Sequence, residues 1–329
     1  MPANLPPDYY AAEKRYRQAE TYEQKIECLR EMLAIMPKHK GTEHLQGDLK
    51  RKIAKLNSQS QKKHVKAKSA GLDHIPNEGA GQAVLVGAPN TGKSSLLNYF
   101  TNAKSEVAEF PFSTYRPVCG MMPFEDIGIQ LVDIPPISPN YRESWMFNII
   151  RMADVVLLLA DLSDPKSKSQ LQEVIQILEN HHILLKKNGE SRPQGQIAVK
   201  TTLFVGTKSD EKDNAIDEGA LRNLLDPSIP FLNVSLLKED QLDVFKRSIF
   251  LSMDIIRVYT KIPGKPADYE KPYLLKHGAT VQEAAEIIHK ELSDSMTFAR
   301  IWGSEKYDGQ RVERDHKLED RDVIEIHTK

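Results

Sequence analysis

Cysteine is scarce in this chain of 329 residues, which contains only Cys28 and Cys119, far apart in the sequence. Two isolated cysteines make neither a disulfide framework nor a metal or redox motif, so we expect a reducing, intracellular compartment. Long apolar runs are also missing, because the longest, at 155–160, is much shorter than a membrane span. The N-terminus lacks the pattern of a secretion signal. We therefore expect a cytoplasmic protein with no membrane partner.

An overall excess of one charge is absent as well: 45 Lys and Arg stand against 46 Asp and Glu, and 40% of the residues are hydrophobic. This composition and length indicate a folded chain of two or three domains. The balance hides a basic stretch at 38–68, where ten basic residues stand against Glu43 and Asp48. The basic residues are Lys38, Lys40, Lys50, Arg51, Lys52, Lys55, Lys62, Lys63, Lys66 and Lys68.

Two apolar stripes at helical spacing accompany the basic stretch. They are Tyr22, Ile26, Leu29 and Leu33, and then Leu45, Leu49, Ile53 and Leu56. They predict a helical hairpin, followed by a linker at 57–80 without periodicity. The basic face of the hairpin is either a solvated surface or a contact for RNA phosphates, and no interleaved aromatic residues support base stacking by this segment.

Residues 82–100, QAVLVGAPNTGKSSLLNYF, place an apolar strand before a glycine-containing loop and the start of a helix. The spacing G-x-x-x-x-G-K-S in this context predicts a phosphate-binding loop, in which backbone N–H groups and a helix N-terminus face the phosphates. The predicted nucleotide-binding residues are Gly87, Ala88, Pro89, Asn90, Thr91, Gly92, Lys93, Ser94 and Ser95. Lys93 is expected to reach the β- and γ-phosphates, and Ser94 to ligate Mg²⁺.

Two further segments supply candidate metal ligands. Thr114 lies in the loop EFPFSTYRPVCG at 109–120, which γ-phosphate and Mg²⁺ would order as a switch. Asp133 ends the apolar segment IQLVD and is expected to hold Mg²⁺ through water. Pro136 follows where a glycine N–H normally faces the γ-phosphate, and proline has no N–H.

The segment TTLFVGTKSD at 201–210 predicts the reader of the base. After a strand, Thr207, Lys208 and Asp210 follow in the pattern T-K-x-D. A carboxylate at Asp210 accepts from N1–H and the exocyclic amine of guanine, a pair of donors that adenine lacks, and Lys208 is expected over the base plane. Ser235, after the strand at 231–234, is a weaker candidate for contact with guanine O6.

The strands expected near 82–86, 117–124, 128–134, 153–161, 202–206 and 231–234 alternate with helices near 93–102, 143–152, 167–182, 215–225 and 238–252. This order predicts an α/β fold with a doubly wound, mostly parallel sheet that binds ligands at the carboxyl ends of its strands. After residue 252 the chain predicts a small sheet over one helix, which a capping-box pattern begins at Thr280. The scattered histidines of this part indicate no metal site, and a binding module is expected.

Together the motifs GAPNTGKSS, FPFSTYRP, DIPP and GTKSD resemble those of Obg-family GTPases, in particular the developmentally regulated GTP-binding proteins. The C-terminal segment from IRVYTKIPGKP to RDVIEIHT resembles a TGS domain, which is a β-grasp fold. The resemblance implies a P-loop GTPase domain at 71–252, between a basic helical hairpin with its tail at 1–70 and a TGS domain at 253–329. It also implies that Asn90 helps to hold a catalytic K⁺ ion, so Lys93, Thr114 and Asn90 are the catalytic candidates.

The chain departs from this family in three ways. Pro136 replaces the glycine of the third motif, and ISPNYRESWMFNIIR stands where the family has a glycine-rich switch. The domain that the family inserts within its GTPase domain is also missing, because only residues 169–200 separate the fourth expected strand from TTLFVG. Ile137 stands where Ras-like enzymes carry a glutamine, and a hydrophobic residue there is usual in this family.

We therefore expect a GTP-binding protein that hydrolyses GTP to GDP slowly with Mg²⁺ and acts as a switch on RNA or ribosomes. The basic N-terminal segment and the TGS domain would carry these contacts, and a protein partner is also compatible with them. The alternative is a guanine-nucleotide-dependent binding protein with negligible hydrolysis. An ATPase is a third interpretation, which the T-K-x-D pattern disfavours.

Overall fold

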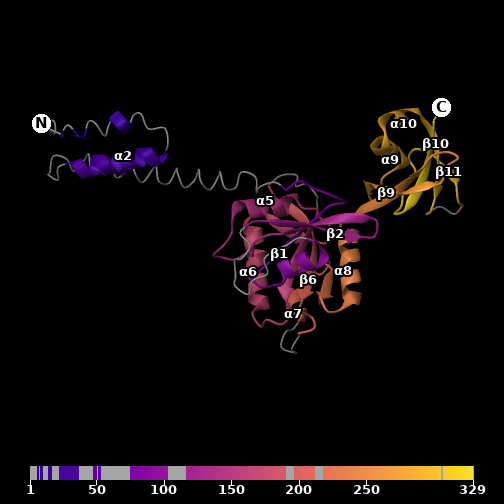
Figure 1. Ribbon diagram of the computed structural model, residues 1–329. Coiled ribbons are helices and arrows are strands. Elements are labelled where there is room, and N and C mark those ends of the chain that lie inside the picture. Colours follow the sequence, from indigo (N-terminus) through magenta and orange to yellow (C-terminus); the bar gives the residue numbers. More distant parts are fainter. Residues whose placement is uncertain are drawn as a thin grey trace. The chain divides into compact units, whose positions relative to one another are not determined.

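The computed structural model (Figure 1) describes residues 6, 8–9, 14–16, 22–36, 47–49, 51–52, 75–102, 116–189, 196–211, 218–304 and 307–328. The chain divides into two compact units, Met1–Asp73 and His74–Lys329, and each is described by itself. Among these residues no helix is both long and apolar enough to span a membrane.

The first unit contains helix α2, Tyr22–Ile35, where the first apolar stripe predicts a helix. Leu29 on this helix is buried and belongs to a small core with Tyr9, Met32, Met36 and Leu49. Leu49 comes from the second predicted stripe, whose described residues 47–49 and 51–52 are helical. Of the basic stretch only Arg51 and Lys52 are described, both exposed, and its other eight basic residues lie outside the described part.

The second unit begins with a seven-stranded sheet in the order β2-β3-β1-β4-β6-β5, with β7 also paired to β6. Its strands are β1 (Gln82–Gly87), β2 (Val118–Phe124), β3 (Ile127–Asp133), β4 (Val155–Asp161), β5 (Ile183–Lys186), β6 (Ala198–Thr207) and β7 (Phe231–Val234). Only β2 runs antiparallel to its neighbour, so the carboxyl ends of the other strands share one edge. This confirms the predicted doubly wound α/β fold.

Helices cover both faces of this sheet, as Figure 1 shows for α6 and α8. The helices are α4 (Lys93–Phe100), α5 (Ser144–Met152), α6 (Ser167–Asn180), α7 (Glu218–Arg222) and α8 (Glu239–Ser252). Leu97 of α4 and Phe245 of α8 belong to one core cluster with Leu85 of β1 and Leu157 of β4. Strands β1 and β4 are buried along their whole length, because layers of helices on two sides exclude water from both faces.

Strand β5 is an element that the sequence analysis does not predict. It has four residues and follows α6 directly, and its burial falls from Ile183 to the exposed Lys186. Its pairing with β6 places it at the edge of the sheet. A strand this short gives little periodicity, so long-range pairing rather than local pattern decides its conformation. Within the described residues between β4 and β6, only α6 and β5 occur.

The C-terminal part forms a five-stranded sheet in the order β11-β10-β12-β8-β9, with β12 parallel to β8. Its elements are β8 (Ile255–Lys261), β9 (Ala267–Lys276), α9 (Val281–Ile288), α10 (Lys290–Ser295), β10 (Met296–Trp302), β11 (Gln310–Val312) and β12 (Asp322–Thr328). The predicted capping box is present, because Thr280 and Glu283 each accept from the other's backbone N–H. The single predicted helix is divided, since His289 is extended between α9 and α10.

Candidate functional site

The phosphate loop leaves the carboxyl end of β1 and enters α4. At its start, a Cβ atom on Gly87 would lie 2.8 Å from both the Leu159 carbonyl oxygen and the Thr91 hydroxyl, so no side chain fits there. Gly92 precedes α4 with a φ of 80°, which favours glycine. Asn90 is exposed and also has a positive φ, 63°. The local geometry therefore explains why the loop needs glycine at both ends of its turn.

Lys93 lies inside this loop with only 6% of its surface exposed. Its ammonium group donates to the carbonyl oxygen of Ala88 at 2.7 Å and to the Thr91 hydroxyl at 3.2 Å. Burial lowers the pKa of Lys93 to about 8, against the opposing effect of the Asp133 carboxylate. A cation desolvated in this way gains strongly from an anion, which suits a lysine that binds phosphate.

The predicted metal ligands Ser94 and Asp133 meet, because the Ser94 hydroxyl donates to Asp133 Oδ2 at 2.6 Å. Asp133 ends β3, which pairs with β1 and so places the carboxylate beside the phosphate loop. A hydroxyl and a carboxylate are the hard oxygen donors that Mg²⁺ prefers, so this pair fits the predicted ion. Thr114 lies outside the described residues. Within them, no group of three or more His, Cys, Asp or Glu side chains forms a further candidate metal site.

The segment after Asp133 packs against the phosphate loop. Residues 134–137, which include Pro135 and Pro136, are all buried. The N–H of Ile137 donates to the carbonyl oxygen of Gly87 at 3.1 Å. The first backbone N–H after the two prolines is therefore already bonded to the loop.

The predicted guanine motif follows β6 and is attached to the phosphate loop. The Thr207 hydroxyl lies 3.1 Å from the carbonyl oxygens of both Thr91 and Ala160. Lys208 has a positive φ of 54°, and its ammonium group forms an ion pair of 2.5 Å with Asp161. The structure thus brings the phosphate-binding and base-reading segments together at one edge of the sheet.

Asp210 and Ser235, predicted from separate segments, also meet. The Ser235 hydroxyl is hydrogen-bonded to the Asp210 carboxylate and lowers its pKa below the usual range, although Asp210 itself is exposed. Gln241 of α8 joins the two segments, because its Oε1 accepts from Ser235 N at 2.8 Å and from the Ser209 hydroxyl at 3.0 Å. These contacts place Ser235 beside the predicted guanine motif, although the sequence pattern around Ser235 is only weak evidence for such a position.

Two residues of this site, Asp161 and Gln241, are not predicted from the sequence. Asp161 ends the apolar strand VVLLLAD, as Asp133 ends IQLVD, so the same strand-end pattern carried a signal for it. Gln241 lies in an ordinary polar helical turn and carried none.

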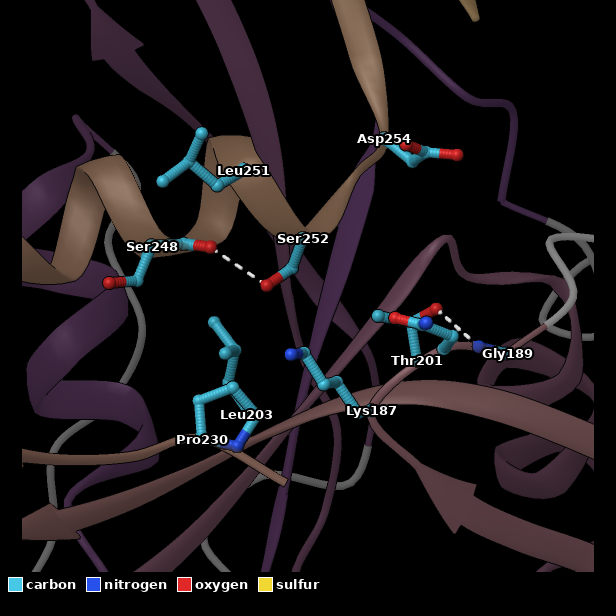
Figure 2. Close-up of a pocket in the computed structure, with 10 residues that line it drawn as sticks. Lys187, Gly189, Thr201, Leu203, Pro230, Ser248, Leu251, Ser252 and Asp254 are labelled. Atoms are coloured by element: carbon cyan, nitrogen blue, oxygen red, sulfur yellow. Dashed lines mark hydrogen bonds between the residues drawn. The ribbon is translucent and has the colours of Figure 1, made fainter. Parts of the chain in front are cut away.

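A pocket of about 420 Å³ lies elsewhere on this unit (Figure 2). Thr201 near the start of β6 and Pro230 just before β7 line it, together with Ser252 at the end of α8. The Ser252 hydroxyl donates to the Ser248 carbonyl oxygen at 2.8 Å, and the N–H of Gly189 donates to the Thr201 hydroxyl at 2.9 Å. Dashed lines mark both hydrogen bonds in Figure 2. The pocket is at the amino ends of these strands, so none of the predicted nucleotide-binding residues lines it.

Comparison with known proteins identifies two domains. The family described as 50S ribosome-binding GTPase matches residues 82–188, and the TGS domain family matches residues 256–328. These regions contain the phosphate loop and the five-stranded sheet, respectively.

Individual relatives extend over most of the chain. An uncharacterized GTP-binding protein of Methanocaldococcus jannaschii is 29% identical over 367 residues, covering 92% of each sequence. Human developmentally-regulated GTP-binding protein 2 is 27% identical over 361 residues, covering 92% of this chain and 98% of that protein. Among solved structures, the G domain of the T. maritima FeoB iron transporter is 26% identical and covers 52% of this chain and 98% of its own, with a TM-score of 0.36. The chain therefore contains a segment that matches the GTPase family and a C-terminal segment that matches the TGS domain family, and it is similar over most of its length to the developmentally regulated GTP-binding proteins.

Proposed function

We propose that this chain binds GTP and GDP, hydrolyses GTP slowly with Mg²⁺, and acts as a switch on RNA or ribosomes in the cytoplasm. The observation that carries the nucleotide part is the contact of the Thr207 hydroxyl with the Thr91 carbonyl oxygen at 3.1 Å. It holds the guanine motif at a fixed place beside the phosphate loop, as a nucleotide with its base and phosphates bound at once requires.

The reaction would be transfer of the γ-phosphoryl group to water. Mg²⁺, when bound, neutralises charge on the phosphate oxygens. Ser94 and Asp133 would hold it, with Thr114 as a further proposed ligand, while Lys93 and the loop N–H groups bind the phosphates. The hydrocarbon side chain of Ile137 cannot accept a proton, so it is no general base. The site residues would contribute position and charge instead. Slow hydrolysis follows, with Asn90 available to hold K⁺ as the family resemblance implies.

A second candidate function is nucleotide-dependent binding with negligible hydrolysis. The buried segment at 134–137, bonded to Gly87 through the N–H of Ile137, favours it, because a segment held in this way responds weakly to the γ-phosphate. Single-turnover GTP hydrolysis with Mg²⁺, measured with K⁺ and with Na⁺, separates the two. A slow hydrolysis that Lys93→Ala abolishes supports the GTPase, and no release of phosphate above background supports the alternative.

The proposed RNA or ribosome contact depends on the basic stretch at 38–68 and on the TGS domain. The ten basic residues of that stretch and the description of the matching GTPase family support it. Contacts to phosphates release counterions, so binding should weaken steeply with salt. Co-sedimentation with ribosomes tests this for the wild type and for a variant with Lys62, Lys63, Lys66 and Lys68 changed to Ala. Lys166→Ala is the control, and equal binding of all three proteins at every salt concentration would contradict the proposal.

A further inference from the structure

Asp161 is a buried carboxylate next to the guanine motif, with 5% of its surface exposed. It ends β4, and its register partner on β6 is Thr207. One carboxylate oxygen, Oδ1, accepts from the N–H of Ser163 at 2.8 Å and from its hydroxyl at 2.7 Å. The other oxygen, Oδ2, accepts from the Lys208 ammonium group at 2.5 Å. Asp161 therefore has a fixed orientation and directs one oxygen at the lysine.

Lys208 needs such an anchor. Its backbone has a φ of 54°, in the left-handed region that residues other than glycine seldom adopt. Its side chain is 37% exposed and carries several rotatable bonds, so a lysine without a partner would sample many rotamers. The backbone before Lys208 is fixed because the Thr207 hydroxyl donates to the Thr91 carbonyl oxygen. The ammonium group of Lys208 is fixed by its ion pair with Asp161.

We infer that Asp161 is a positioning residue for guanine-nucleotide binding that acts through Lys208. By holding the ammonium group, Asp161 fixes the aliphatic stem of Lys208, which can then meet the base without first losing rotamer freedom. This inference rests on the proposed function, because it needs the T-K-x-D segment to bind guanine.

Two effects of removing the charge of Asp161 oppose each other. Loss of the anchor weakens binding, whereas loss of a negative charge makes the site more positive and attracts an anionic nucleotide. The long-range attraction is screened beyond about 8 Å at physiological salt, while the contact between two partly buried groups is screened much less. We therefore expect the loss of the anchor to prevail, and to do so more clearly as salt is added.

A double-mutant cycle on the full chain tests the inference. Affinity and dissociation rate for fluorescent GDP are measured for the wild type, Asp161→Asn, Lys208→Met and the double variant, at low and high salt. Asp161→Asn should raise the Kd about tenfold, which corresponds to the loss of one charge-assisted hydrogen bond. In the Lys208→Met background the same change should have no further effect, a result that a purely structural role of Asp161 would not produce.

Two further variants keep the test decisive. Asp164→Asn is the matched control, because Asp164 lies in the same turn but accepts from Lys166 N and Gln170 instead of Lys208. Ser163→Ala removes one bond to Asp161 Oδ1 and should weaken GDP binding in the same direction but by less, even if Asp161→Asn folds poorly. Unchanged or tighter binding by Asp161→Asn, or effects that add to those of Lys208→Met, would overturn the inference. Failure of the wild type to bind GDP would instead overturn the proposed function.

Discussion

At the scale of single residues, the proposed choice of guanine over adenine would depend on one exposed carboxylate, that of Asp210. Asp210 is held by a hydrogen bond from Ser235, which lowers the pKa of Asp210 below its usual range. The carboxylate is therefore ionised at neutral pH and only accepts hydrogen bonds, as recognition of two guanine donors requires.

The change Asp210→Asn should lower GDP affinity and favour xanthosine nucleotides, because the amide replaces one acceptor by a donor. We expect a loss of about tenfold in GDP affinity, because the amide NH₂ group would face a guanine donor and one of the two hydrogen bonds to the base would be lost. Competition of GDP and XDP against a fluorescent nucleotide measures this. Glu211→Gln, at the neighbouring acid, is the control, and an unchanged preference for GDP in Asp210→Asn would refute the assignment.

Lys93 is the second residue on which the proposed nucleotide binding would depend, because it is a buried cation within the predicted phosphate loop. Lys93→Ala should weaken binding of a GTP analogue at least a hundredfold, since the triphosphate would lose a charge-assisted contact in a desolvated site. Calorimetry measures the affinity, and Lys166→Ala serves as the control at an exposed lysine. Thermal unfolding without nucleotide should show no large loss of stability, because the change removes a buried charge. Equal affinity of wild type and variant would contradict the phosphate-loop assignment.

At the scale of elements, the segment that follows β3 differs from a mobile switch. Residues 134–137 are buried, and the N–H of Ile137 donates to Gly87 at 3.1 Å. Pro136 has no N–H to offer a γ-phosphate, and it restricts the conformation of Pro135 before it. The segment is therefore bonded to the phosphate loop through Ile137 and offers no N–H at position 136, so we expect GTP and GDP to bind with similar affinity.

Pro136→Gly restores an N–H at this position and should raise either the preference for GTP or the rate of hydrolysis. A hydrogen bond to a charged group contributes about 1.5–3 kcal/mol, so the gain is at most about ten- to a hundredfold. Affinities for a GTP analogue and GDP, with single-turnover rates, measure it. Pro135→Gly is the matched control, because it loosens the same segment one residue earlier. The interpretation fails if the two variants behave alike, or if the wild type already prefers GTP strongly and hydrolyses it rapidly.

At the scale of the whole His74–Lys329 unit, Arg257 joins the turn between β2 and β3 to the TGS domain. This arginine is 3% exposed and bonds to Asp320 at 2.6 Å and to Asp126 at 2.7 Å, and it also contacts Glu125. The hydrogen bond from Arg257 lowers the pKa of Glu125. Burial alone would raise the pKa of Asp126 and Asp320, but hydrogen bonds from Arg257, and from Tyr259 in the case of Asp126, lower it.

The pH dependence of stability follows from the direction of these shifts. Carboxylates with a lowered pKa in the folded state stabilise it above their ordinary pKa of about 4, and this stability is lost as the pH falls through the lowered values. Arg257→Gln should be about 1–3 kcal/mol less stable than the wild type at pH 7, because it removes charge-assisted hydrogen bonds from three partly exposed carboxylates. The difference should shrink towards pH 3.

Urea unfolding across this range measures both effects. Arg321→Gln is the control, because Arg321 is 58% exposed and contacts Glu125 at the surface, so its removal should cost little. A difference between wild type and Arg257→Gln that is the same at pH 7 and pH 3 would show that the charges of this cluster do not stabilise the unit.

The sequence by itself determined which residue types make up the proposed nucleotide site. The spacing from Gly87 to Ser94, the acid Asp133 at a strand end and the pattern around Asp210 are local, and each residue type has few other uses in such a pattern. The same holds for the order of strands and helices, because buried strands and amphipathic helices have periods that can be read along the chain.

Only the tertiary structure decided which of these residues touch. Asp161 pairs with Lys208, and Gln241 bridges Ser209 and Ser235, because sheet register and helix packing bring distant segments together. Strand β5 likewise depends on pairing with β6, and Arg257 depends on a partner, Asp126, far along the chain. Such contacts leave no local period in the sequence, since the free energy that selects them comes from burial and pairing across the fold rather than from neighbours along the chain.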